Sequence, residues 1–194
     1  MNTIVLDTET SGLPEMKKFG EYYNPLLLKY YDTSRIIEIG YVVYSSNKNE
    51  LFRRSFLIKP KNFVITNHNI HGITNKMAND EGIQIVDALD ILLCDILNVS
   101  NFVAHNVNFD YNVLLSECYR NYNFELADKL KSLNKECTML MGKKYLNQSK
   151  YPSLKNLYLH FNKDVNGQTL KCHRAMEDTL MCANCYFNMI NITK

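Results

Sequence analysis

The sequence lacks any apolar run that approaches the roughly 18 to 20 residues needed to span a bilayer. It also lacks a strong charge of either sign, since 22 Lys and Arg residues against 20 Asp and Glu residues give a formal net charge of +2. These absences predict no membrane association and disfavour a strongly basic, chromatin-type binder, although a local basic patch is still compatible with them. The N-terminal segment MNTIVLDTETSGL has no basic region, long apolar stretch or small-residue cleavage site, so we expect no secretion signal.

The six cysteines show no pattern typical of a disulfide framework or a structural zinc site. Without a secretion signal they are expected to be reduced thiols in a cytoplasmic or nuclear protein. Cys182 and Cys185 form a CxxC pair, but no second pair at matching spacing accompanies them. We therefore interpret both as small apolar residues on a helix.

The 194 residues, 46% of them hydrophobic and 22% charged, predict one globular domain over residues 1–194, without internal repeats or a linker. Apolar periodicity predicts strands at 2–7, 36–44, 51–58 and 101–105, and helices at 83–97, 108–122 and 174–190. Ser153 is the expected N-cap of a further helix over 154–161. This order predicts an α/β fold with a mixed central sheet flanked by helices.

One long connection, residues 14–34, follows the first strand and shows little periodicity. One hypothesis is a flap that stacks bases and contacts phosphates. Its side chains would be Tyr22, Tyr23, Tyr30, Tyr31, Lys17, Lys18 and Lys29. The alternative is a surface loop packed by its own tyrosines.

Charge is unevenly spread along the chain. Residues 76–128 carry nine acidic and two basic side chains, a net charge of −7, whereas residues 129–155 carry seven lysines and one glutamate, a net charge of +6. Two solvated faces would explain this distribution. A lysine-rich segment beside a polyanion site would also explain it.

The first candidate for chemistry is Asp7-Thr8-Glu9, directly after an apolar run. Residues two apart on a strand point to the same side, roughly 6 to 7 Å apart, a spacing that suits carboxylates holding hard cations. Gly12 is expected to let the backbone turn and a ligand approach closely. Taken alone, the pair could also be solvated acids at the end of a strand.

Two more clusters follow. Asp110 lies near the start of a helix, where a carboxylate is favoured by the helix dipole alone. Asn106 and Asn108 can cap that helix or make turns. His173 precedes the last helix and Asp178 lies on it. A histidine there can take a proton from water, because its pKa lies near neutrality.

Together, the three clusters resemble the motifs of the DEDDh exonucleases, the DnaQ-like branch of the ribonuclease H-like superfamily. The motifs are DTETSG at 7–12, HNVNFD at 105–110 and HRAMED at 173–178, in the family's order. HGIT at 71–74 and YPSL at 151–154 resemble further family segments, so the resemblance covers about residues 4–182. The sister DEDDy group has Tyr four residues before the last Asp, where this chain has Arg174, and oligoribonucleases carry DxEMTG.

The resemblance implies a two-metal mechanism with Mg²⁺ or Mn²⁺. Asp7 would bridge two divalent cations, Glu9 and Asp178 would complete the site nearer the water nucleophile, and Asp110 would hold the second cation. His173 would be the general base. The reaction would release nucleoside 5′-monophosphates in the 3′ to 5′ direction. The resemblance places the 3′-terminal nucleotide against Thr8, Thr10, Ser11, Gly12, Leu13, His105, Asn106 and Phe109, although core packing would explain Phe109 as well.

The sequence thus predicts a metal-dependent 3′–5′ exonuclease of the proofreading or repair type, acting on DNA. An exoribonuclease that trims RNA ends and a non-catalytic nucleic-acid-binding subunit are the alternatives. The expected partner is a single-stranded or frayed nucleic-acid 3′ end. A proofreading role would also require a DNA polymerase, whereas a free-standing repair, degradative or viral enzyme is equally compatible. The sequence leaves the oligomeric state open.

Overall fold

The computed structural model describes residues 1–18, 20–167 and 173–192. Its central sheet has five strands in the order β5-β4-β1-β6-β7. β1 pairs antiparallel with β4 and parallel with β6, while β4 and β5 form a hairpin at one edge. The strands are β1 (Asn2–Thr10), β4 (Ile36–Tyr44), β5 (Glu50–Leu57), β6 (Val99–Ala104) and β7 (Asn134–Cys137). This mixed sheet flanked by helices confirms the expected α/β fold class.

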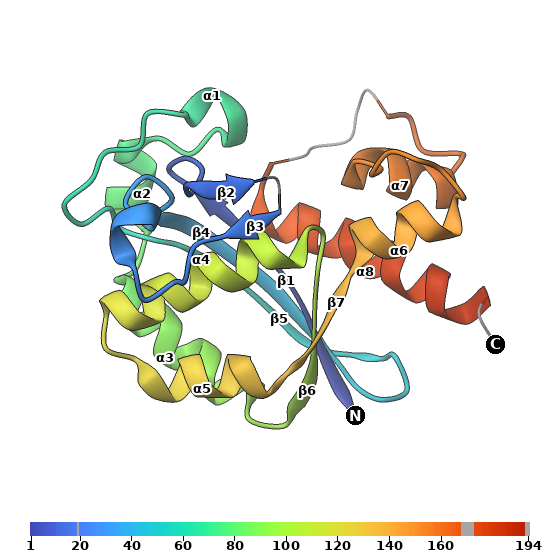
Figure 1. Ribbon diagram of the computed structural model, residues 1–194, viewed down its shortest axis with the longest axis horizontal. Helices are drawn as coiled ribbons and strands as arrows, with labels where there is room; N and C mark the ends of the chain where they lie inside the picture. Colours follow the sequence, from blue (N-terminus) through green and yellow to red (C-terminus); the bar gives the residue numbers. More distant parts are fainter. Residues whose placement is uncertain (19, 168–172, 193–194) are drawn as a thin grey trace.

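Helices cover both faces of the sheet (Figure 1). α3, α4 and α5 pack on the face that carries Ile4 and Leu6 of β1, whereas α8 packs on the face that carries Val5. α6 and α7 pack in turn against α8. The helices are α1 (His68–His71), α2 (Asn75–Glu81), α3 (Ile85–Ile96), α4 (Val107–Arg120), α5 (Phe124–Ser132), α6 (Thr138–Tyr145), α7 (Leu154–Phe161) and α8 (Ala175–Ile192). Alternate residues of β1 therefore face different helices, and this decides where its carboxylates point.

The elements expected from periodicity are present, with ends displaced by a few residues. β1 runs beyond the expected end to Thr10, because its pairing with β4 continues until Thr10 lies opposite Ile36. Ser153 caps α7 as predicted, with its Oγ accepting a backbone N–H of the first turn at 3.2 Å. Cys182 and Cys185 are buried on α8, as small apolar residues would be. None of the helices in the described part of the chain is long and apolar enough to cross a membrane.

The edge strand β7 was not predicted. Its sequence, NKEC, is mostly polar and shows no apolar alternation. It is a strand because it pairs in parallel with β6 over four residues, an interaction between segments that lie about 30 positions apart. Local patterns carry no information about such pairing.

The connection over residues 14–34 forms a small hairpin of β2 (Met16–Lys18) and β3 (Glu21–Tyr22), followed by the 3₁₀ helix η1 (Leu28–Tyr31). Tyr31 is fully buried and donates a hydrogen bond to the carbonyl of Tyr23 at 2.5 Å. The rings of Tyr23 and Tyr30 stack on each other with centroids 3.7 Å apart. Burial of Tyr31 in the main core excludes it from the flap hypothesis, and the stacking of Tyr23 on Tyr30 fits the alternative of a loop packed by its own tyrosines.

Candidate active site

Two carboxylates of β1 lie on the face of the sheet that α8 covers. Asp7 and Glu9 lie two and four residues after Val5 on the strand, so their side chains point to the same face as that of Val5, which packs against α8. On the neighbouring strand β4, Gly40 lies opposite Asp7 and Glu38 lies opposite Glu9. The strand pair thus presents three carboxylates side by side beneath the start of α8.

A further carboxylate comes from the first turn of α4. Asp110 is 2% exposed, and its Oδ1 accepts two hydrogen bonds from Thr8, one from the backbone N–H at 3.0 Å and one from the hydroxyl at 2.9 Å. These bonds tie α4 to β1 and hold Asp110 near Asp7. Thr8 is itself buried. Thr8 therefore holds Asp110 in place, and its expected contact with the nucleotide stays a prediction.

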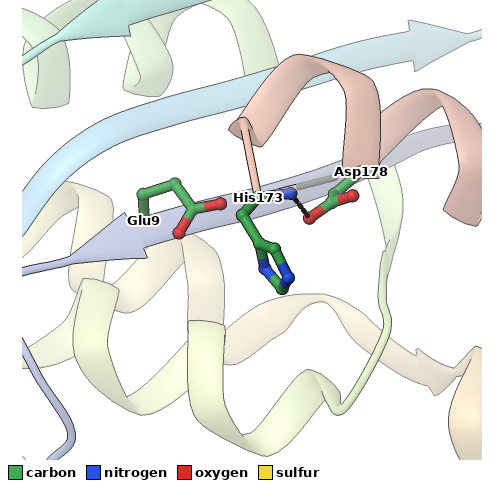
Figure 2. Close-up of side chains that lie close together, drawn as sticks. All are labelled: Glu9, His173 and Asp178. Atoms are coloured by element: carbon green, nitrogen blue, oxygen red, sulfur yellow. Dashed lines mark hydrogen bonds between the residues drawn. The ribbon is translucent and has the colours of Figure 1, made fainter. Parts of the chain in front are cut away.

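His173 and Asp178 come from the start of α8 (Figure 2). His173 precedes the helix with a φ of 66°, in the left-handed region that is uncommon for residues other than glycine. Its backbone N–H donates to Oδ2 of Asp178 at 3.0 Å. One ligand atom from each of Glu9, His173 and Asp178 lies within 4.8 Å of the others. Segments from opposite ends of the chain thus converge on one point.

Burial and mutual repulsion raise the pKa values of these carboxyl groups. Burial raises the pKa of Glu9 from its ordinary 4.5 to about 8, and the charge of Asp178 adds to the effect. Burial likewise raises the pKa of Asp110 to about 7. Burial, followed by the charge of Asp110, raises the pKa of Asp7 well above its ordinary range, and burial raises the pKa of Asp178.

The donor set fits hard divalent cations. Carboxylate oxygens are the ligands that Mg²⁺ and Mn²⁺ prefer. Several ionised carboxylates crowded away from solvent are unfavourable without a counter-charge. Bound cations would supply that charge and favour the ionised forms of Asp7, Glu9, Asp110 and Asp178.

The segment after β1 lies at the edge of this site. Ser11 donates a hydrogen bond to the carbonyl of Thr33 at 3.0 Å, and Thr10 donates to the carbonyl of Gly12 at 2.7 Å. A Cβ on Gly12 would lie 2.8 Å from the Thr33 carbonyl oxygen, so glycine is needed here for the close approach of the two chain segments. The expected approach of a ligand to Gly12 stays a prediction. Leu13 is 70% exposed and presents an apolar surface to solvent.

Apart from Asp110, the residues of the motif at 105–110 contact neighbouring elements of the fold. The ring nitrogens of His105 lie 3.0 and 3.2 Å from oxygen atoms of α6 and of the loop before α7, and burial lowers its pKa to about 4. Asn106 stands at the N-cap position of α4 with a φ of 70° and makes no side-chain cap bond, so of the two expected roles it forms a turn rather than a cap. Its side chain lies beside Tyr22 of β3. Phe109 is partly buried against the main core.

Sequence reasoning missed Glu38 and Arg174 as part of this region. Arg174 was used only to distinguish subfamilies. Glu38 is the one charged residue within the strand IIEIGYVVY, and the structure buries it to 2% exposure. A charge in an otherwise apolar strand needs a buried partner, and that signal could have identified it.

The family comparison decides the class of this protein. The sequence model of the RNase_T exonuclease family matches residues 4–186. The chain belongs to this exonuclease family. The match confirms the expected DnaQ-like, DEDDh-type resemblance within the ribonuclease H-like superfamily. No curated protein sequence matches the chain.

Solved exonuclease structures share the fold of this family member. E. coli exonuclease I in complex with a dT13 oligonucleotide is 18% identical with a TM-score of 0.69, covering 99% of this chain and 41% of that chain. Exonuclease I from Methylocaldum szegediense is 16% identical with a TM-score of 0.70, covering 100% and 41%. Cell-death related nuclease 4 (CRN-4) is 15% identical with a TM-score of 0.60, covering 98% and 64%. This exonuclease-family chain thus spans about two fifths of the length of the exonuclease I structures.

Proposed function

We propose that this protein is a metal-dependent 3′–5′ exonuclease that hydrolyses the terminal phosphodiester of a DNA strand and releases a nucleoside 5′-monophosphate. One observation carries the proposal. The carboxylates of β1, the first turn of α4 and the start of α8 converge beside His173, in a member of the exonuclease family.

The proposed roles follow from the positions of the side chains. Asp7, Glu9, Asp110 and Asp178 would hold two divalent cations, Mg²⁺ or Mn²⁺, with Asp7 shared between them. Such cations, when bound, stabilise the charge on the attacking and leaving oxygens of a phosphodiester. His173 is exposed, so its ring can meet the attacking water and accept its proton at a ring nitrogen. Leu13, exposed at the edge of the site, would contact the terminal base.

DNA is the preferred substrate class in this proposal because exonuclease I, which shares the fold over nearly the whole chain, was crystallised with dT13 and dA16 oligonucleotides. Another exonuclease I structure is an ExoI/SSB-Ct complex. The comparisons give no support to a polymerase partner. We therefore propose free-standing activity as the form to test first.

The test uses 5′-labelled single-stranded DNA, mismatched duplex DNA and single-stranded RNA, each incubated with the protein in Mg²⁺, Mn²⁺ or EDTA. We expect a ladder that shortens from the 3′ end, requires metal and is strongest on DNA. Faster cleavage of RNA would replace the DNA proposal with the exoribonuclease alternative. Binding without cleavage of any substrate, by folded protein, would support the non-catalytic subunit.

A further inference from the structure

An ion pair between Glu38 and Arg174, whose side chain is 36% exposed, joins β4 to the start of α8, next to the proposed catalytic groups. Glu38 lies on β4 opposite Glu9 and is 2% exposed. Arg174 makes three hydrogen bonds to it, from Nη2 to Oε1 at 2.7 Å and from Nε to Oε2 and Oε1 at 3.0 and 3.2 Å. Such a two-pronged arrangement fixes both the distance and the orientation of the guanidinium group.

The same carboxylate also holds the backbone of α8. Oε2 of Glu38 accepts the backbone N–H of Ala175, the first residue of the helix, at 2.9 Å. One such acceptor satisfies a donor that the start of a helix leaves without an intrahelical partner. Glu38 therefore binds two consecutive residues, the side chain of Arg174 and the main chain of Ala175.

A second contact on β4 strengthens this docking. A Cβ on Gly40 would lie 2.5 Å from the carbonyl carbon of Ala175, so only glycine lets the helix approach the strand this closely. The hydroxyl of Thr179, one turn along α8, donates to the carbonyl of Gly40 at 2.9 Å. Glu38 and Gly40 thus form a docking platform on β4 for the first turn of α8.

His173 lies directly before the clamped residues. The left-handed backbone conformation of His173 costs free energy and persists only where neighbouring contacts enforce it. The described contacts that do so are its own N–H bond to Asp178 and the hydrogen bonds that Arg174 and Ala175 donate to Glu38. The position of the His173 ring therefore depends on where Glu38 holds the next two residues.

We propose that Glu38 and Arg174 are positioning residues, a clamp that sets His173 against the carboxylates of β1 for catalysis. This inference rests on the proposed function. Stability alone is a weak reason for such a pair, because a partly exposed cation contributes little and burial of the carboxylate costs desolvation free energy. The placement of a general base is a stronger reason for this ion pair, since displacement of a catalytic group by about 1 Å can cost about 10²-fold in rate.

The test compares kcat and KM of Arg174→Met, Arg174→Lys and Glu38→Gln with those of the unchanged protein on the same labelled oligonucleotide. Glu50→Gln is the matched control, because Glu50 makes an equally two-pronged pair with Arg53 at the surface of β5. We expect kcat of Arg174→Met to fall about 10- to 100-fold with KM changed less than about twofold, and Lys to restore part of the loss. Glu50→Gln should leave both constants unchanged. If Arg174→Met does not fold, Arg174→Lys and Glu38→Gln carry the comparison.

The decisive measurement introduces Arg174→Met into the His173→Ala variant. If the clamp acts through His173, then His173→Ala and the double variant with Arg174→Met have the same kcat. An equal further loss of kcat in the His173→Ala background would overturn the proposal and assign the pair to general stability. So would a kcat for Arg174→Met within about twofold of the unchanged protein, since misplacing a catalytic group has far larger effects on rate. Failure of the proposed function is separate, because the unchanged protein and Glu50→Gln would then show no metal-dependent cleavage.

Discussion

At the scale of single residues, the carboxylates of the site differ in the groups that lie beside them. Asp110 is held by two hydrogen bonds from Thr8, whereas Glu9 has the buried carboxylate of Glu38 opposite it. The protein without metal therefore concentrates negative charge where burial already disfavours it. Removing one carboxylate, or the histidine beside them, tests this arrangement directly.

Asp7→Ala should abolish cleavage without unfolding the protein, because it removes the proposed shared ligand and relieves repulsion among the remaining acids. In EDTA its melting temperature should equal or exceed that of the unchanged protein. The control is Asp80→Ala, which removes an exposed carboxylate of α2. A cleavage rate near that of the unchanged protein would contradict the assignment of Asp7.

His173→Ala should slow turnover by roughly 10²- to 10⁴-fold, the usual contribution of a general base. Substrate affinity and metal-induced stabilisation should change little, because the carboxylate ligands remain. Single-turnover cleavage at saturating metal measures the rate. Unchanged turnover would refute the role given to His173.

At the scale of elements, the site depends on how closely α8 lies on the sheet. Gly40 is the contact point, and its position opposite Asp7 couples helix docking to the geometry of the carboxylates. The hairpin of β2 and β3 reaches the start of α4, where Tyr22 lies beside Asn106. Packing of separate elements, rather than any one loop, therefore forms the site.

Gly40→Ala should push α8 away from β4 and lower the free energy of unfolding by about 1–3 kcal/mol, the usual cost of overpacking. Cleavage should fall at the same time, since Asp178 and His173 move with the helix. Chemical denaturation and the oligonucleotide assay measure the two effects, with the exposed substitution Ser46→Ala as control. A stable variant with full activity would show that this close contact is unimportant.

At the scale of the whole molecule, the raised carboxyl pKa values link folding to pH. Between about 4.5 and about 8, the folded protein without metal binds more protons at Glu9 than the unfolded chain does. The contribution of Glu9 to folding stability is therefore fully present below pH about 4.5 and is lost as the pH rises through about 8. In EDTA we expect the melting temperature to fall from pH 5 to pH 8.5, and Glu9→Gln to flatten that slope. A melting temperature that stays constant or rises between pH 5 and pH 8.5 would contradict these pKa shifts.

Metal should reverse this trend, because cations bind the ionised carboxylates and release their protons. Saturating Mn²⁺ or Mg²⁺ at about 100 times its dissociation constant should stabilise the fold by about 2.7 kcal/mol. The resulting shift in melting temperature should be larger at pH 8 than at pH 6 and absent in Asp7→Ala. Equal shifts in both proteins would place the cation elsewhere.

The sequence by itself determined the class of the protein and the main elements. The order DTETSG, HNVNFD and HRAMED marked the exonuclease family, since each motif is a run of neighbouring residues. Periodicity located the long strands and helices, because burial on one face repeats locally along the chain. The cap of α7 at Ser153 followed for the same reason.

Only the tertiary structure decided how the motifs are held. Strand β7 exists through its pairing with β6, and Tyr31 enters the core although its segment shows no clear periodicity. Glu38 and Arg174 are 136 positions apart, so no local pattern joins them. Buried charges find partners through the packing of whole elements, and the contact between β4 and α8 therefore appears only once the chain has folded.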